Sequence, residues 1–271
     1  MNEIPRIFVE VSRSLGADPL LIQGAGGNSS VKTGDSWMWV KASGKWLMHA
    51  GTEDVFVAVD PTVVNANIKA GMDEPTAGAV LPAGNSQLRP SIETTLHSLM
   101  PHQVVFHTHS INTIAHAIRR DAADVLADKL AGLQWNLVPY SQPGLPLTQL
   151  VAGLLGDKAC DVLVIQNHGL VVGGNSPSAA LALMQDVEQR LACDPHPMVS
   201  VDLAGLEAVC AGTDFKVADT DLVHQLALPD GGFEVACRGS LYPDHVVFLG
   251  SAIAGVESPE ELKAFCGASS D

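Results

Sequence analysis

The segment "DVLVIQNHGLVVGG", residues 161–174, contains two aliphatic runs separated by Asn167, His168 and Gly169. Short apolar runs bounded by turn residues are typical of buried strands. A glycine allows the backbone to turn sharply between them. The segment therefore predicts a pair of buried strands, with the ring of His168 facing a cavity at the end of a strand.

A second apolar run, "VVFHTHS" at residues 104–110, ends in two histidines one residue apart. Successive side chains of a strand point to opposite faces, so His107 and His109 emerge on one side while Thr108 points away. Imidazole nitrogens suit zinc, and a close pair plus one remote histidine, such as His168, is a common three-histidine site. The His-x-His pair alone is weak evidence of metal binding, and a histidine in Asn-His-Gly alone is more often a polar group at a turn. The prediction therefore depends on their combination with an acid, Glu93, at the start of the preceding helix.

The rest of the chain predicts a layered fold. Apolar residues at helical spacing predict helices at residues 2–15, 91–100, 111–132, 148–155, 177–192, 218–228 and 258–267. Ser91 is the expected N-cap of the helix at 91–100, and Ile92 is expected in the apolar stripe of that helix. Further strands are predicted at residues 36–44, 54–60 and 245–251, and irregular segments at 71–90 and 134–148.

Helices that alternate irregularly with hairpins favour an α/β fold of three layers, α/β/α, with a central mixed, mainly antiparallel sheet. The "PHP" tripeptide at residues 195–197 marks a joint. We therefore expect a catalytic domain at residues 1–195 and a C-terminal extension at 196–271 that packs on the same domain.

The composition limits the classes of partner that the protein is expected to bind. The 271 residues carry a formal net charge of −15, and none of the 15 Lys and Arg residues forms a dense run, which argues against nucleic acid. No apolar run approaches the roughly 20 residues of a membrane-spanning helix, and the N-terminal segment is expected to be neither a signal peptide nor an anchor. The five scattered cysteines lack a C-x-x-C pair, which favours a reduced, cytoplasmic protein.

Five motifs together resemble a known family. The stretches "GAGGNSS", "KASG", "RPSIETTLH", "HTHS" and "NHGL" begin at residues 24, 41, 89, 107 and 167. Their order and approximate spacing are similar to those of the class II aldolase/adducin family, which includes zinc-dependent sugar-phosphate aldolases and epimerases. The resemblance covers roughly residues 5–192. The tail resembles the extension of the aldolase domain in bifunctional aldolase/short-chain dehydrogenase proteins.

The resemblance implies specific roles for site residues. It assigns zinc, or another divalent metal, to His107, His109 and His168, and the role of acid/base to Glu93. It assigns a substrate phosphate to Asn28, Ser43, Gly44 and Ser91. His97 lies four residues after Glu93 on the same helical face, and we expect it to make a structural hydrogen bond rather than bind metal.

Two features depart from the family pattern. The family's second serine is replaced by Ile92, which removes one phosphate hydrogen bond and leaves a carboxylate-bearing or unphosphorylated sugar acid as an alternative substrate. The family's proton-donor tyrosine, which comes from a neighbouring subunit, aligns securely with neither Tyr140 nor Tyr242.

These features predict a metal-dependent lyase that cleaves or forms a carbon–carbon bond in a small hydroxylated carbonyl substrate, a sugar phosphate or sugar acid, via an enediolate. The family implies a homotetramer. The alternatives are an epimerase, decarboxylase or dehydratase on the same metal, or a metal-free adducin-like binding or scaffold module. Glu93 favours aldol chemistry, because family epimerases have aspartate there, and the retained histidines argue against the scaffold.

Overall fold

The computed structural model describes residues 3–85, 87–156, 160–194, 198, 200–227, 232–240, 242–251, 253–256 and 258–268. The chain divides into two compact units, Met1–Cys193 and Asp194–Asp271. The "PHP" joint predicted at 195–197 lies outside the described residues. Packing of the C-terminal extension on the catalytic domain stays a prediction.

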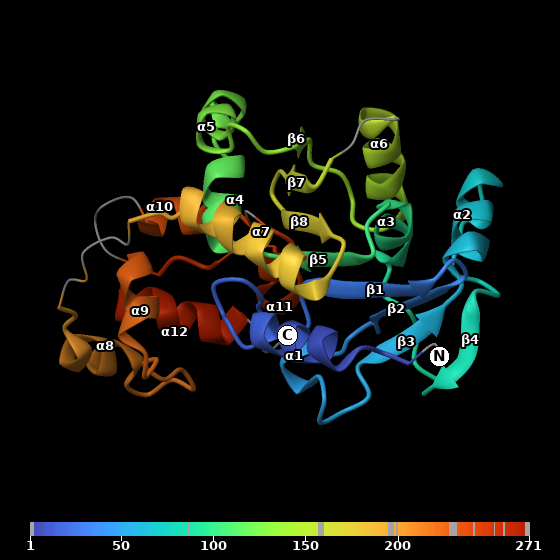
Figure 1. Ribbon diagram of the computed structural model, residues 1–271. Coiled ribbons are helices and arrows are strands. Elements are labelled where there is room, and N and C mark those ends of the chain that lie inside the picture. Colours follow the sequence, from blue (N-terminus) through green and yellow to red (C-terminus); the bar gives the residue numbers. More distant parts are fainter. Residues whose placement is uncertain are drawn as a thin grey trace. The chain divides into compact units, whose positions relative to one another are not determined.

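An eight-stranded sheet forms the centre of the first unit (Figure 1). Its strands are β1 (Asn28–Gly34), β2 (Trp37–Lys41), β3 (Phe56–Val59), β4 (Val80–Gly84), β5 (Val104–Thr108), β6 (Trp135–Val138), β7 (Val162–Ile165) and β8 (Gly169–Gly174). The order across the sheet is β4-β3-β2-β1-β5-β8-β7-β6. All neighbours pair antiparallel except β6 and β7, which are parallel. The mixed, mainly antiparallel sheet is therefore confirmed.

Helices cover both faces of this sheet. They are α1 (Arg6–Gly16), α2 (Pro61–Lys69), α3 (Thr94–Leu99), α4 (Ile111–Ala117), α5 (Ala122–Lys129), α6 (Leu145–Leu155) and α7 (Pro177–Arg190), with a short 3-10 turn at Leu47–His49. Apolar residues of α1, α4, α5 and α7 pack on one face with Val104 and Phe106 of β5. Those of α3 and α6 pack on the other face with Val105, and α2 joins the core of that layer around β2 and β3. This alternation along β5 produces the predicted three layers.

The helix predicted at 91–100 begins later than expected. It starts at Thr94, with Glu93 rather than Ser91 at the N-cap position. Pro90 and Ser91 are instead bound to the end of β2 and the residue after it, because Pro90 pairs with Ala42 and the N–H of Ser91 donates to the carbonyl oxygen of Lys41 at 3.2 Å. Ile92 is 65% exposed, so its predicted place in the apolar stripe was wrong.

Three other segments of the first unit differ from expectation. The helix predicted at 111–132 is two helices, α4 and α5, separated by a turn in which Arg119 makes two 2.8 Å contacts with the Asp121 carboxylate. The segments predicted as irregular, 71–90 and 134–148, contain β4 and β6. Both strands lie at sheet edges and are only partly buried, so they lack the apolar run that identifies a central strand.

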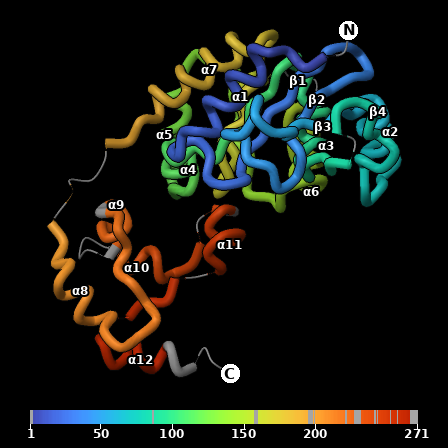
Figure 2. Tube along the Cα trace, turned by 90° about the horizontal axis from the view of Figure 1, so that it is seen from below, coloured from blue at the N-terminus to red at the C-terminus, as the bar shows by residue number. Residues whose placement is uncertain are grey.

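The second unit is helical in its described part (Figure 2). Its helices are α8 (Leu203–Cys210), α9 (Asp221–His224), α10 (Gly232–Cys237), α11 (Pro243–Leu249) and α12 (Pro259–Ala268), with a 3-10 turn at Gln225–Ala227. The strand predicted at 245–251 was wrong, because α11 occupies residues 245–249. A proline and Asp244 in the first turn favour a helix there.

None of the helices in the described parts of the chain has the length and apolar character needed to cross a membrane.

Candidate metal centre

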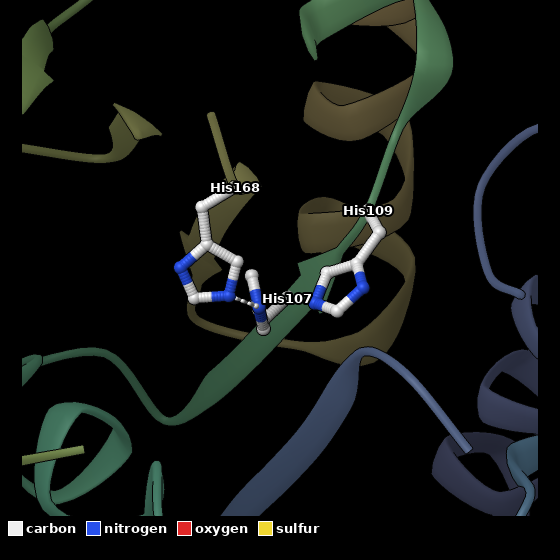
Figure 3. Close-up of side chains that lie close together, drawn as sticks. All are labelled: His107, His109 and His168. Atoms are coloured by element: carbon white, nitrogen blue, oxygen red, sulfur yellow. Dashed lines mark hydrogen bonds between the residues drawn. The ribbon is translucent and has the colours of Figure 1, made fainter. Parts of the chain in front are cut away.

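The three predicted histidines converge at one end of the sheet (Figure 3). His107 is the last residue but one of β5, His109 directly follows the strand, and His168 lies in the turn between β7 and β8. Because β5 pairs with β8, this turn is brought beside the end of β5. The ring centroids are 4.8–5.1 Å apart, and one ligating nitrogen from each ring lies within 4.8 Å of the others. All three side chains are buried.

The turn that carries His168 has unusual backbone geometry. Asn167 has a φ of 54°, and it is the one non-glycine residue with positive φ in the described ranges. Asparagine tolerates this left-handed conformation better than most residues. At Gly169, a Cβ atom would lie 2.1 Å from the carbonyl oxygen of Thr108. The turn therefore needs a residue without a side chain here to bring His168 against β5.

The hydrogen bonds of His107 leave one ring nitrogen facing the cluster. Its Nδ1 is 3.1 Å from the carbonyl oxygen of Leu170. A carbonyl only accepts, so Nδ1 carries a proton, and in the neutral tautomer Nε2 presents a lone pair. That Nε2 is 3.3 Å from Nε2 of His168. A backbone partner for the second nitrogen is the usual arrangement for a metal-binding histidine.

Glu93 joins the cluster from the N-terminus of α3. Its Oε2 is 3.4 Å from Nε2 of His107, and its Oε1 is 3.3 Å from Nε2 of His168. Asn28 at the start of β1 donates from Nδ2 to Oε2 at 2.6 Å. Burial alone would raise the pKa of Glu93, but His107, His168 and His109 outweigh burial and lower this pKa to about 2. The carboxylate is therefore ionised.

The cluster suits a divalent cation. Burial lowers the pKa of His168 to about 3 against the opposing effect of Glu93, so this ring is neutral near pH 7. Oε1 of Glu93 is buried and makes no hydrogen bond within the described residues. A buried carboxylate oxygen without a hydrogen bond is costly unless a cation lies beside it. Three imidazole nitrogens next to it form a donor set that zinc prefers.

The residues predicted to bind phosphate lie in two places. Ser43 and Gly44 are exposed in the turn after β2, where the N–H of Ser43 donates to the carbonyl oxygen of Arg89 at 2.9 Å. The pairing of this turn with the segment before α3 brings Ser91 alongside. The Oγ of Ser91 accepts from the N–H of Glu93 at 3.3 Å. Asn28 instead lies at Glu93, a contact that sequence reasoning missed because it joins two distant motifs.

Lys41 and Gly27 fix the position of the glycine-rich loop at residues 24–27. Nζ of the buried Lys41 donates to the carbonyl oxygens of Ala25 at 2.5 Å and Lys45 at 2.8 Å. Gly27 has a φ of 60°, and a Cβ there would lie 2.8 Å from the carbonyl oxygen of His107. The backbone of the loop therefore approaches the end of β5 closely.

The two tyrosines considered as proton donors lie in different units. Tyr140, in the loop after β6, is 59% exposed. Tyr242 lies in the second unit, immediately before α11. His97 makes the structural hydrogen bond that the sequence predicts, from Nδ1 to Ser30 Oγ at 2.8 Å.

Comparisons with known proteins identify the first unit. The class II aldolase and adducin N-terminal domain matches residues 6–193. A curated relative, the uncharacterized oxidoreductase YuxG of Bacillus subtilis (strain 168), is 28% identical over 197 residues. The match covers 66% of this chain but only 28% of that protein, so the chain spans about a quarter of this relative's length.

Two solved structures share the fold. The N-terminal class II aldolase domain of a conserved protein from Thermoplasma acidophilum is 28% identical, with a TM-score of 0.59 over 70% of this chain and 93% of that one. A sugar-phosphate aldolase from Thermotoga maritima is 14% identical, with a TM-score of 0.52 over 68% and 91% of the two chains. At that identity the second shows the fold alone.

Proposed function

The chain belongs to the class II aldolase and adducin family, and from this premise we propose that it is a metal-dependent lyase acting on a small sugar phosphate or sugar acid. The reaction cleaves or forms a carbon–carbon bond via an enediolate. The observation that supports this most is a buried carboxylate, Glu93, within 3.4 Å of two Nε2 atoms of a three-imidazole cluster. A scaffold protein would have no use for this costly arrangement.

Each group at the centre has a role in the proposed reaction. His107, His109 and His168 would hold a divalent cation, zinc by the preference of imidazole. Such a cation draws electron density from a substrate carbonyl and its adjacent hydroxyl, which stabilises an enediolate. Glu93 is the proton carrier, and Asn28 orients its carboxylate.

In the proposed reaction, Glu93 exchanges a proton with the carbon of the enediolate. In the cleavage direction, Glu93 takes the proton of the hydroxyl that becomes the aldehyde, directly or through water, while the carbon–carbon bond breaks and its electron pair passes into the enediolate. Glu93 then delivers this proton to the enediolate carbon and is ionised again. In the synthetic direction it removes that proton first. A pKa of about 2 keeps the resting carboxylate ionised, which is the state that the removal step requires.

We place the anionic group of the substrate at Ser43, Gly44 and Ser91. The first two are exposed and therefore accessible, and backbone N–H groups and hydroxyls suit either a phosphate or a carboxylate. With Ile92 in place of a second serine, fewer donors remain than the family's phosphate site has. We further propose that the protein is cytoplasmic and forms a homotetramer. Light scattering of the purified protein tests the number of subunits.

The experiment combines metal content with proton exchange. Protein purified without added metal is analysed for zinc and other divalent ions, before and after reconstitution. Exchange of carbon-bound hydrogen with D2O is then followed by NMR for hydroxyacetone, dihydroxyacetone phosphate and hydroxypyruvate. We expect one ion per chain and exchange of at least one probe. Metal content far below one ion, without gain on reconstitution, would contradict the proposal.

Two substitutions separate binding from proton transfer. His107→Ala should abolish metal occupancy, because one of three imidazoles is lost. Glu93→Gln should keep the metal and lower the exchange rate by about 10²- to 10⁴-fold, the usual contribution of a general acid or base. Unchanged exchange in Glu93→Gln would refute the role of Glu93.

Product analysis separates aldol cleavage from its alternatives. A carbonyl-trapping reagent should capture an aldehyde when the enzyme acts on a panel of ketose phosphates and sugar acids. Inversion of a stereocentre without aldehyde would instead show an epimerase, and release of carbon dioxide a decarboxylase.

A further inference from the structure

Strand β1 carries polar side chains at alternate positions on the face that meets α3. Asn28, Ser30 and Lys32 share this face because side chains alternate along a strand. The contacts are Asn28 Nδ2 to Glu93 Oε2 at 2.6 Å, Ser30 Oγ to His97 Nδ1 at 2.8 Å, and Lys32 Nζ to the carbonyl oxygen of Met100. We call these three contacts the polar ladder. They connect the whole length of α3, from N-cap to C-cap, to a single strand.

The middle contact of the polar ladder is fully buried. His97 is 0% exposed and Ser30 is 1% exposed. Nε2 of His97 has no hydrogen-bond partner in the part of the chain that the structure describes, so Ser30 is the polar anchor of the ring there. Burial lowers the pKa of His97 to about 3. The ring is therefore neutral and anchors α3 without placing a charge beside Glu93.

His97 is linked to Glu93 through the first turn of α3. The N–H of His97 donates to the carbonyl oxygen of Glu93 at 3.1 Å, so the two residues lie one turn apart on the same face. Fixing the His97 ring on β1 therefore fixes the rotation of the turn that carries Glu93.

We propose that Ser30 and His97 are positioning residues for Glu93. Their hydrogen bond sets the rotation of α3 on β1, and this rotation holds the Glu93 carboxylate against the histidine cluster. Neither residue touches the reacting atoms. The inference rests on the proposed function, in which Glu93 carries the proton.

The neighbouring Ser29 provides a matched control. Ser29 is 0% exposed, lies on the same strand, and its hydroxyl is 2.9 Å from the hydroxyl of Ser12 on α1. It therefore faces the opposite side of the sheet. Ser29→Ala and Ser30→Ala each remove one buried hydroxyl bond, so both should lower the midpoint of thermal unfolding by a similar amount.

The two variants should differ in activity. In the zinc-loaded protein, Ser30→Ala should lower kcat for proton exchange about 10- to 100-fold, because a small misplacement of a catalytic group has effects of this size. KM and metal content should not change. Ser29→Ala should exchange at the wild-type rate. Equal losses in the two variants would overturn the proposal, since loss of packing alone would then explain both.

Substitutions of His97 test which ring nitrogen matters. Asparagine places an amide atom near the position of Nδ1, whereas glutamine places one near that of Nε2. His97→Asn should therefore retain most of the exchange rate, and His97→Gln should lose it as Ser30→Ala does. Loss of the exchange rate in His97→Asn alone, with retention in His97→Gln, would contradict the role of the Ser30 contact.

Crystal structures of the two serine variants give a second readout that does not depend on activity. In Ser30→Ala the Glu93 carboxylate should leave its place beside Nε2 of His107, and in Ser29→Ala it should stay. An unmoved carboxylate in Ser30→Ala would refute the positioning role. If the wild-type protein exchanged none of the probes, the proposed function would fail, while these structures would still decide the role of the polar ladder.

Discussion

Gly169 shows how one residue shapes the centre at the scale of single atoms. A Cβ there would lie 2.1 Å from the carbonyl oxygen of Thr108 and 3.1 Å from Cα of His109. Both neighbours are backbone atoms, so no side-chain rotation could relieve the clash. The close approach of the turn to β5 therefore depends on glycine at this position. The position of the His168 ring depends on it as well.

Gly169→Ala should therefore lower the free energy of unfolding by about 3 kcal/mol, the upper part of the range for forced overpacking. Gly153, exposed in α6 with nothing within 4 Å of an added Cβ, is the control. Gly153→Ala should raise stability by about 1 kcal/mol, because alanine favours a helix interior over glycine. Urea unfolding followed by circular dichroism measures both, and equal effects of the two changes would contradict this account.

At the scale of elements, the start of α4 stabilises the end of β5. Ser110 follows His109 directly, and its Oγ accepts from the N–H of Thr113 at 3.1 Å. The cap holds the chain where it leaves the cluster. Ser176 caps α7 in the same way, accepting from the N–H of Ala179 at 3.1 Å, but no proposed ligand lies next to it in sequence.

The two caps can be compared by substitution. Ser176→Ala should lower the free energy of unfolding by about 1 kcal/mol, the usual value of an N-cap, and Ser110→Ala by more, because the buried Ser110 hydroxyl is also hydrogen-bonded to Glu188. Only Ser110→Ala should weaken metal binding, by about 10-fold, as the loss of a supporting contact does at metal sites. Competition with a chromophoric chelator measures the affinity. Equal affinities in the two variants would show that the cap does not support His109.

At the scale of the whole molecule, the centre and its core lie in the first unit. All residues of the three hydrophobic clusters fall between Ile4 and Leu191, and so do the proposed ligands and Glu93. The boundary between the units follows Cys193. We therefore predict that the first unit folds, and binds the proposed metal, without the second unit.

A fragment of residues 1–194 should consequently unfold cooperatively on heating and bind the same number of metal ions per chain as the full-length protein. Circular dichroism and metal analysis of both proteins check this. A fragment that is insoluble, or that folds without binding metal, would show that residues beyond 194 complete the core or the site.

The sequence by itself determined the parts that depend on neighbours along the chain. Alternation in "VVFHTHS" placed His107 and His109 on one face, and the apolar runs around Asn167 marked two paired central strands. Together with the family motifs, such patterns sufficed for the three-layer architecture. Their physical basis is local, because side-chain direction repeats every two residues in a strand and every 3.6 in a helix.

Only the tertiary structure decided features that depend on pairing between distant segments. Pairing of Pro90 with Ala42 delays the start of α3, and the contact of Asn28 with Glu93 joins residues 65 positions apart. The edge strands β4 and β6 form because a neighbour supplies their hydrogen bonds, although their own residues are only partly buried. Such contacts have no periodic signal along the chain, since they arise from the free energy of burying and pairing segments that meet only in the folded protein.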